Sequence, residues 1–186
     1  MKISFELSPT DLDHFREVMA RARQATANLS TQEIVDNASK LMSVVNQSET
    51  SSFIRHRINQ LETLIGMVVD KGWGLTEEDR KRVVEALAYF SESDDLIPDD
   101  IPGLGFLDDA IMIELVTNEL EHEIQAYRDF VIYRAAEAGR KGEDAGTLER
   151  ADWLEERRQQ LHSRMRRRRR RGRGGSDGGK SPFSLL

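Results

Sequence analysis

Three adjacent aspartate pairs lie within the stretch DDLIPDDIPGLGFLDDA, residues 94–110. Carboxylate oxygens are the ligands that Ca²⁺ and Mg²⁺ prefer, and a hard cation needs several of them converging on one point. Paired aspartates could therefore hold a divalent metal ion and support hydrolysis. The spacing matches no calcium-binding loop, and the candidate metal ligands are Asp95, Asp99, Asp108 and Asp109.

A structural role is the favoured interpretation of this stretch. Asp108 and Asp109 fall in the first turn of an expected helix, where the helix dipole favours a carboxylate by about 0.3–1 kcal/mol. The pair at 99–100 lies between two prolines, where aspartates accept hydrogen bonds from turn N–H groups. The sequence predicts a packed corner between two helices, with its acids turned to backbone or solvent. Its apolar side chains should dock against the helices: Leu96, Ile97, Ile101, Leu104, Phe106 and Leu107.

This stretch resembles the core motif of the YkvA-like family, a small bacterial and archaeal domain of unknown function. Members of that family share the pattern D-x-I-P-D-x-I-P-x-x-G-x-x-D-D. The resemblance covers about residues 80–120; it implies a short helical unit and no established activity, so no catalytic residue is carried over. The pattern is filled by Asp95, Leu96, Ile97, Pro98, Asp99, Ile101, Pro102, Gly105, Asp108 and Asp109.

Other signs of catalysis are weak. Glu119 and His122 have the Glu-x-x-His spacing of di-iron carboxylate bundles, but such sites use two of these motifs, and only one occurs here. There is no cysteine, and no Ser/His/Asp arrangement or phosphate-binding glycine loop is evident. We therefore expect a non-enzymatic binding or adaptor protein without a cofactor; a metal-dependent enzyme that uses the paired aspartates is the alternative.

An arginine cluster near the C-terminus has the clearest physical consequence. Guanidinium groups pair with phosphate through two parallel hydrogen bonds, and clustered positive charge binds nucleic acid by releasing counterions. The following RGRGG run is similar to segments of RNA-binding tails. The sequence predicts salt-sensitive nucleic-acid binding with little sequence preference. The candidate residues are Arg164, Arg166, Arg167, Arg168, Arg169, Arg170, Arg171 and Arg173.

The arginine cluster has two alternative candidate partners besides nucleic acid: the acidic body of its own chain and an anionic membrane surface. The net charge is −6, and residues 150–186 carry +8, so residues 1–149 carry −14. The basic segment could fold back on this acidic body. It could also bind an anionic membrane surface, at about 1 kcal/mol per basic residue. The apolar end SPFSLL, residues 181–186, could dock on a protein partner.

Apolar residues recur at helical spacing along most of the chain. Capping boxes at Ser8/Asp11 and Ser30/Glu33 predict the first two helices. A third stripe spans 54–68, a fourth helix begins after Thr76, a long helix runs over 104–136, and Thr147 can cap a last one. The arginine-rich segment is too polar and glycine-rich to order itself, so a flexible polycation is expected.

The predicted fold class is all-α: a bundle of about five to six helices, with a proline-containing corner and a disordered arginine-rich C-terminal tail. Three regions are expected: 1–75, helical; 76–136, the YkvA-like helix, corner and helix; and 137–186, the last helix and basic tail. The absence of cysteine fits a reducing bacterial cytoplasm. No apolar run is long enough for a secretory signal or a membrane span, so a soluble, cytoplasmic protein is expected.

Overall fold

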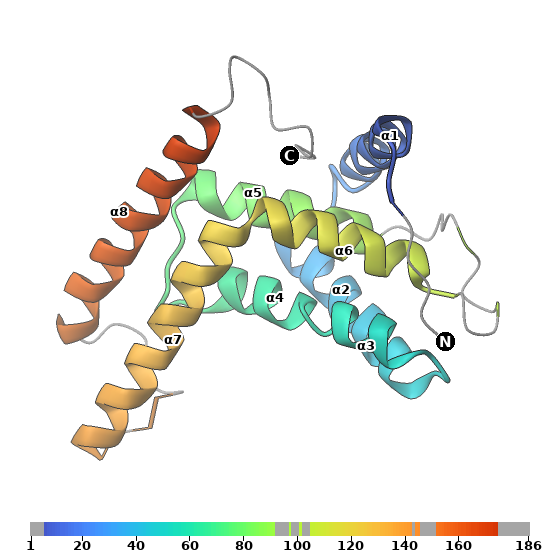
Figure 1. Cartoon of the computed structure of the whole chain (residues 1–186). Helices are drawn as coiled ribbons and strands as arrows, with labels where there is room; N and C mark the ends of the chain where they lie inside the picture. Colours follow the sequence, from blue (N-terminus) through green and yellow to red (C-terminus); the bar gives the residue numbers. More distant parts are fainter. Residues whose placement is uncertain are drawn as a thin grey trace.

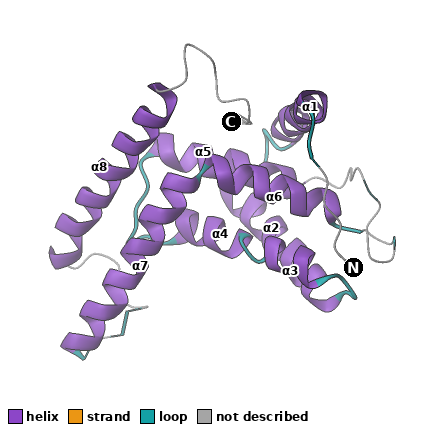
Figure 2. Ribbon diagram, viewed as in Figure 1, coloured by secondary structure: helices purple, strands orange, loops and turns teal. Residues whose placement is uncertain are grey.

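The computed structural model describes residues 6–91, 97, 101, 105–142, 144–145 and 152–174. Within these ranges the chain is helical and contains no strand (Figures 1 and 2). The predicted all-α class is confirmed. The helices are α1 (Pro9–Ala25), α2 (Thr31–Gln47), α3 (Ser52–Ile58), α4 (Leu61–Val69), α5 (Glu77–Leu87), the 3₁₀ helix η1 (Ala88–Ser91), α6 (Leu107–Glu119), α7 (Glu121–Lys141) and α8 (Asp152–Gly174).

Helices α1, α2, α3 and α5 begin where a serine or threonine side chain accepts a hydrogen bond from one of the first free N–H groups. Ser30 accepts a hydrogen bond from the N–H of Glu33 at 3.2 Å, and the Glu33 carboxylate accepts one from the N–H of Ser30 at 2.7 Å. The same reciprocal box joins Ser8 and Asp11 before α1. Both predicted capping boxes are therefore confirmed, because each depends only on residues three positions apart.

Two of the expected helices are each divided. The stripe over 54–68 forms α3 and α4, which are separated at Asn59 and Gln60. The long helix expected over 104–136 forms α6 and α7, and the chain turns at Leu120, which is fully buried (Figure 1). No proline or glycine marks this second bend. Packing of Leu120 in the core sets it, and the local sequence carries no signal for that.

One hydrophobic cluster joins the helices. Its largest fully buried side chains include Trp73, which follows α4, and Phe130 on α7, whose ring centroids lie 5.2 Å apart. α8 packs against α7 and adds buried apolar residues to the same cluster (Figure 1). The division into regions 1–75, 76–136 and 137–186 stays a prediction. No helix in the described ranges is long and apolar enough to cross a membrane.

The loop after α4 is fixed by one carboxylate. Asp70 accepts two hydrogen bonds from the guanidinium of Arg134 on α7, at 2.9 and 2.7 Å. It also accepts hydrogen bonds from the N–H groups of Gly72 and Trp73 and from the Tyr127 hydroxyl, at 2.9, 3.2 and 3.2 Å. This carboxylate therefore joins the α4–α5 loop to α7.

The sequence predicts that the arginine cluster is a flexible polycation. This prediction is wrong for residues 164–174, which form the last turns of α8. Arginine has a high intrinsic helix propensity, and positive charge near a helix C-terminus is favoured by the helix dipole. The helix is also anchored by the buried side chains of Leu154, Leu161 and Met165. Residues 175–186 lie outside the described ranges.

Candidate functional site

The arginine run occupies several faces of α8. A helix has about 3.6 residues per turn, so consecutive side chains cannot share one environment. His162 and Met165 are buried against the bundle, and Arg169, one turn further, is directed to the same side and is 13% exposed. The run therefore contains one inward arginine, Arg169, one that lies at the boundary, Arg166, and others directed outward.

Arg169 binds carboxylates from two other helices. Its Nη1 lies 2.6 Å from Asp79 Oδ1 and 3.0 Å from Glu123 Oε1, and its Nη2 lies 3.4 Å from Glu78 Oε1. Asp79 lies in the first turn of α5 and Glu123 in the first turn of α7, and each side chain is only 1% exposed. One guanidinium thus joins α5, α7 and α8. We call Asp79, Glu123 and Arg169 the buried triad.

The charges of the buried triad stabilise one another. Burial by itself raises the pKa of Asp79, but hydrogen bonds from Arg169 and Thr76 and the charges of Arg169 and Arg166 outweigh burial and hold this pKa below its usual value. Burial likewise lowers the pKa of Arg169, and its two carboxylate partners outweigh that effect and raise it. Asp79 and Arg169 are therefore ionised at neutral pH. The pairing of Arg169 with Asp79 and Glu123 is a direct contact between the basic segment and the acidic body, as expected for one of the alternatives.

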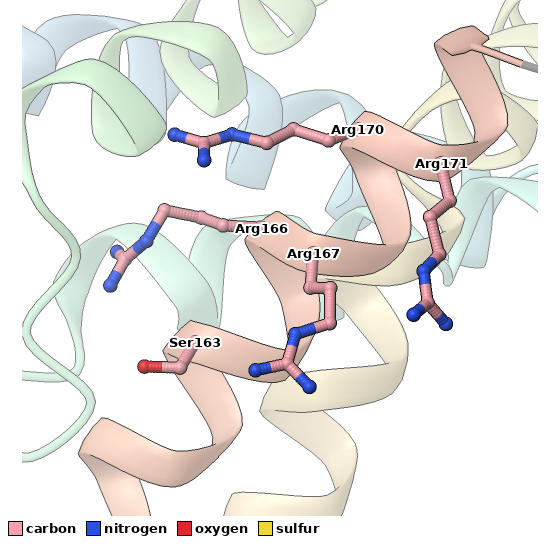
Figure 3. A pocket seen from close by; sticks show the side chains of 5 residues that line it. All are labelled: Ser163, Arg166, Arg167, Arg170 and Arg171. Carbon is pink, nitrogen blue, oxygen red and sulfur yellow. The ribbon is translucent and has the colours of Figure 1, made fainter.

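The outward arginines have a different environment. Their side chains are exposed, and none forms an ion pair with any residue in the described ranges. Figure 3 shows Arg166 and Arg170 leaving one side of α8, and Arg167 and Arg171 leaving the adjacent side. With Ser163 these four residues line a groove of about 420 Å³. The arginines without ion pairs are Arg164, Arg167, Arg168, Arg170 and Arg171.

The remaining candidates of the arginine cluster can also be placed. Arg166 lies between the two environments, because its Nη1 is 3.5 Å from Asp79 Oδ2 while its side chain also lines the groove. Arg173 lies in the last turn of α8, and its side chain is outside the described part of the chain. The sequence offered no signal that Arg169 differs from its neighbours, since its partners lie 46 and 90 positions away.

His162, on α8 just before the arginine run, contacts Trp73 in the core. The two ring centroids are 4.2 Å apart in an edge-to-face arrangement, and His162 is 6% exposed. Its Nε2 has no hydrogen-bond partner in the described structure. Burial lowers the pKa of His162 to about 4, the nearby charges of Arg166 and Arg158 lower it as well, and Asp79 and Glu155 act in the opposite direction. The imidazole is therefore neutral at physiological pH.

We expect the stability of the protein to fall on mild acidification. The unfolded chain takes up a proton at His162 near pH 6.5, whereas the folded protein resists protonation until about pH 4. The free energy of unfolding should therefore be at its full value above pH 6.5 and decrease down to about pH 4. Below that, Asp70 and Asp79, whose pKa values are lowered by folding, should continue the loss.

Urea denaturation at a series of pH values measures this dependence. His162→Gln should remove most of the slope between pH 6.5 and pH 4, because glutamine does not titrate. His14→Gln, at an exposed position on α1, is the control and should leave the slope unchanged. An identical slope in the wild-type protein and in His162→Gln would contradict the assignment.

The aspartate-rich corner contributes buried acids. Asp108 and Asp109 lie in the first turn of α6, as expected; both are buried, and Asp108 is turned to the backbone rather than to solvent. Asp108 Oδ2 accepts a hydrogen bond from the N–H of Ile97 at 3.1 Å, which ties the corner to the helix. Phe106 is buried, as expected, with a positive φ of 65°, whereas Ile101 is 38% exposed and does not dock fully.

The metal-site interpretation finds no further support in the part of the chain that is described. Among those residues, no group of three or more His, Asp or Glu side chains is placed to hold a metal ion. Asp95 and Asp99 lie outside the described ranges, so their position relative to Asp108 and Asp109 stays a prediction. The same holds for the motif residues Leu96, Pro98 and Pro102, whereas Gly105 is buried just before α6.

Comparison with known families identifies the centre of the chain. Residues 82–115 match the model of a protein family of unknown function, DUF1232, and the YkvA-like resemblance is consistent with this match. Neither the curated proteins nor the solved structures contain a match to the chain. The matched segment includes the second half of α5, η1, the corner and the first part of α6, and α8 lies outside it.

Proposed function

We propose that the protein is a non-enzymatic binding protein and that α8 contacts nucleic acid through its outward arginines. The observation that carries this proposal is the presence of five exposed arginines on α8 without ion-pair partners in the described structure. A guanidinium group without a protein counterion is free to form the bidentate hydrogen bonds that phosphate accepts. The proposed contact is therefore with the phosphate backbone.

The arrangement suits a repeating anion better than a single one. Residues four positions apart on a helix are separated by about 6 Å along its axis. Arg166 and Arg170 thus form one row of guanidinium groups along α8, and Arg167 and Arg171 form a second row beside it (Figure 3). A polymer with regularly spaced phosphates can contact both rows. The buried triad holds the helix in place before binding, which reduces the entropy lost on association.

The acidic body restricts where the polymer can lie. Residues 1–149 carry a net charge of −14, so a polyanion is repelled from most of the molecule. The exposed face of α8 combines high positive charge with an open groove. We expect the complex to be strongly salt-dependent and nearly independent of sequence in its backbone contacts.

Neutralising two outward arginines should weaken nucleic-acid binding. Arg167→Gln/Arg170→Gln should lower the affinity for single-stranded DNA and RNA by about tenfold at moderate salt, and should reduce the slope of log affinity against log salt by about 1.4. Fluorescence anisotropy over roughly 50 to 300 mM salt provides both quantities.

The matched control is Arg21→Gln/Lys40→Gln, which removes the same charge from exposed positions on α1 and α2. The control should keep the wild-type affinity to within about twofold, because charges beyond a Debye length of about 10 Å are screened at 0.1 M salt. Equal losses in the two double variants would show that only net charge matters and would refute a specific role of α8. Binding to anionic vesicles without binding to nucleic acid would assign the same face to a membrane surface instead.

A further inference from the structure

A second groove, of about 510 Å³, lies between α7 and α8, and its two walls carry opposite charge. The α8 wall is formed by Arg164, Arg168 and Arg171. The α7 wall is formed by Glu121, His122, Gln125 and Asp129. We call this the α7–α8 groove. It lies beside the arginine rows, and Arg171 lines both grooves.

The opposite charges of the α7–α8 groove are not joined in ion pairs across it. None of its three arginines lies within ion-pair distance of Glu121 or Asp129. Gln125 Nε2 donates a hydrogen bond to Asp129 Oδ1 at 2.8 Å, which holds that carboxylate on the α7 wall. The second oxygen of Asp129 and both oxygens of Glu121 stay available as acceptors. The groove therefore offers guanidinium donors on one side and carboxylate acceptors on the other.

A groove with guanidinium groups on one wall and carboxylates on the other favours a ligand that carries both an anionic group and hydrogen-bond donors. A ligand that is only anionic is repelled by the α7 wall, and one that is only cationic is repelled by the α8 wall. A nucleotide has an anionic phosphate, and its base has an edge of neutral donors and acceptors. Cytosine carries an exocyclic amino group, which donates hydrogen bonds to a carboxylate. Uracil carries a carbonyl oxygen at that position, which a carboxylate repels.

We propose that the α7–α8 groove binds a nucleotide unit of a single strand whose base carries an exocyclic amino group. The phosphate lies against Arg164, Arg168 or Arg171, and the base edge donates to Glu121 and Asp129. Single strands are preferred over duplexes because their base edges are free of pairing partners. This inference rests on the proposed function of α8 and adds a base preference to backbone binding.

Oligo-dC and oligo-dU of equal length are the matched probes, because they carry the same number of phosphates and differ only on the base edge, where cytosine has an amino group at C4 and uracil has a carbonyl at C4 and an N–H at N3. Fluorescence anisotropy with the full chain should show tighter binding of oligo-dC, by roughly fivefold, which corresponds to about 1 kcal/mol, the lower end of the range for base contacts. In Glu121→Gln/Asp129→Asn the amides can donate to a carbonyl and no longer repel phosphate. The affinity for oligo-dU should therefore rise until the two probes bind equally.

The control is Glu17→Gln/Glu62→Gln, which removes two exposed carboxylates from α1 and α4 and should keep the preference for oligo-dC. Circular dichroism melting should confirm that both double variants remain folded. Equal, salt-sensitive binding of the two probes by the wild-type protein would overturn this inference and leave the proposed function intact. A preference that survives in Glu121→Gln/Asp129→Asn would also overturn it. Absence of binding to either probe would overturn the proposed function together with the inference.

Discussion

Asp70→Ala should lower the free energy of unfolding by about 4 kcal/mol, within the range found when one partner of a buried ion pair is removed. Arg134, whose side chain is 14% exposed, would lose both hydrogen bonds to the carboxylate. The N–H groups of Gly72 and Trp73 would lose an acceptor. The loop that positions Trp73 in the core would then lose its attachment to α7.

Chemical denaturation followed by circular dichroism measures this effect. Asp13→Ala is the control, because Asp13 forms an ion pair with Arg16 on the exposed surface of α1 and should contribute no more than about 1 kcal/mol. Asp70→Ala/Arg134→Met should be more stable than Asp70→Ala, since no uncompensated cation remains in the site. A loss below about 1 kcal/mol in Asp70→Ala would show that solvent replaces the carboxylate.

Arg169→Met is expected to destabilise the protein by about 3 kcal/mol, because it leaves Asp79 and Glu123 buried without their shared guanidinium. The loss should be smaller than for Asp70→Ala. Arg166 lies 3.5 Å from Asp79, and Arg82 lies 3.6 Å from Glu123, so each carboxylate keeps a second cation nearby. Methionine retains much of the apolar stem, which isolates the loss of charge from the loss of packing.

The neighbouring substitution Arg170→Met is the matched control for the buried triad. It removes the same charge from an exposed position without an ion pair and should change the free energy of unfolding by no more than about 0.5 kcal/mol. A thermodynamic cycle with Glu123→Gln should give a coupling energy of about 1–3 kcal/mol with Arg169, as expected for residues in one hydrogen-bonded network. Equal effects of Arg169→Met and Arg170→Met would contradict the distinction between inward and outward arginines.

Substitutions at positions 169 and 170 should affect stability and nucleic-acid binding differently. Arg170→Met should weaken nucleic-acid binding and leave stability nearly unchanged. Arg169→Met should reduce stability first and affect binding through the position of α8. The same residue type, one position apart, thus serves two purposes, because the helix turns each side chain into a different environment.

Features that depend on residues three or four positions apart were determined by the sequence. The boxes at Ser8/Asp11 and Ser30/Glu33 needed only local spacing, and so did the apolar stripes that established the all-α class. The placement of Asp108 and Asp109 in the first turn of a helix also followed from the sequence, because the chain cannot continue a helix through the preceding prolines. In each case the residues that matter are close together in the sequence.

The tertiary structure decided everything that depends on distant partners. The burial of Asp108 and the bend at Leu120 each arise from packing between segments that are not adjacent in sequence, and the same kind of packing anchors the arginine run of α8 to the bundle. The six consecutive arginines are indistinguishable in the sequence, but Arg169 is the one that contacts both Asp79 and Glu123 in the described structure. Its role depends on how α5, α7 and α8 pack together, and no local pattern contains that information.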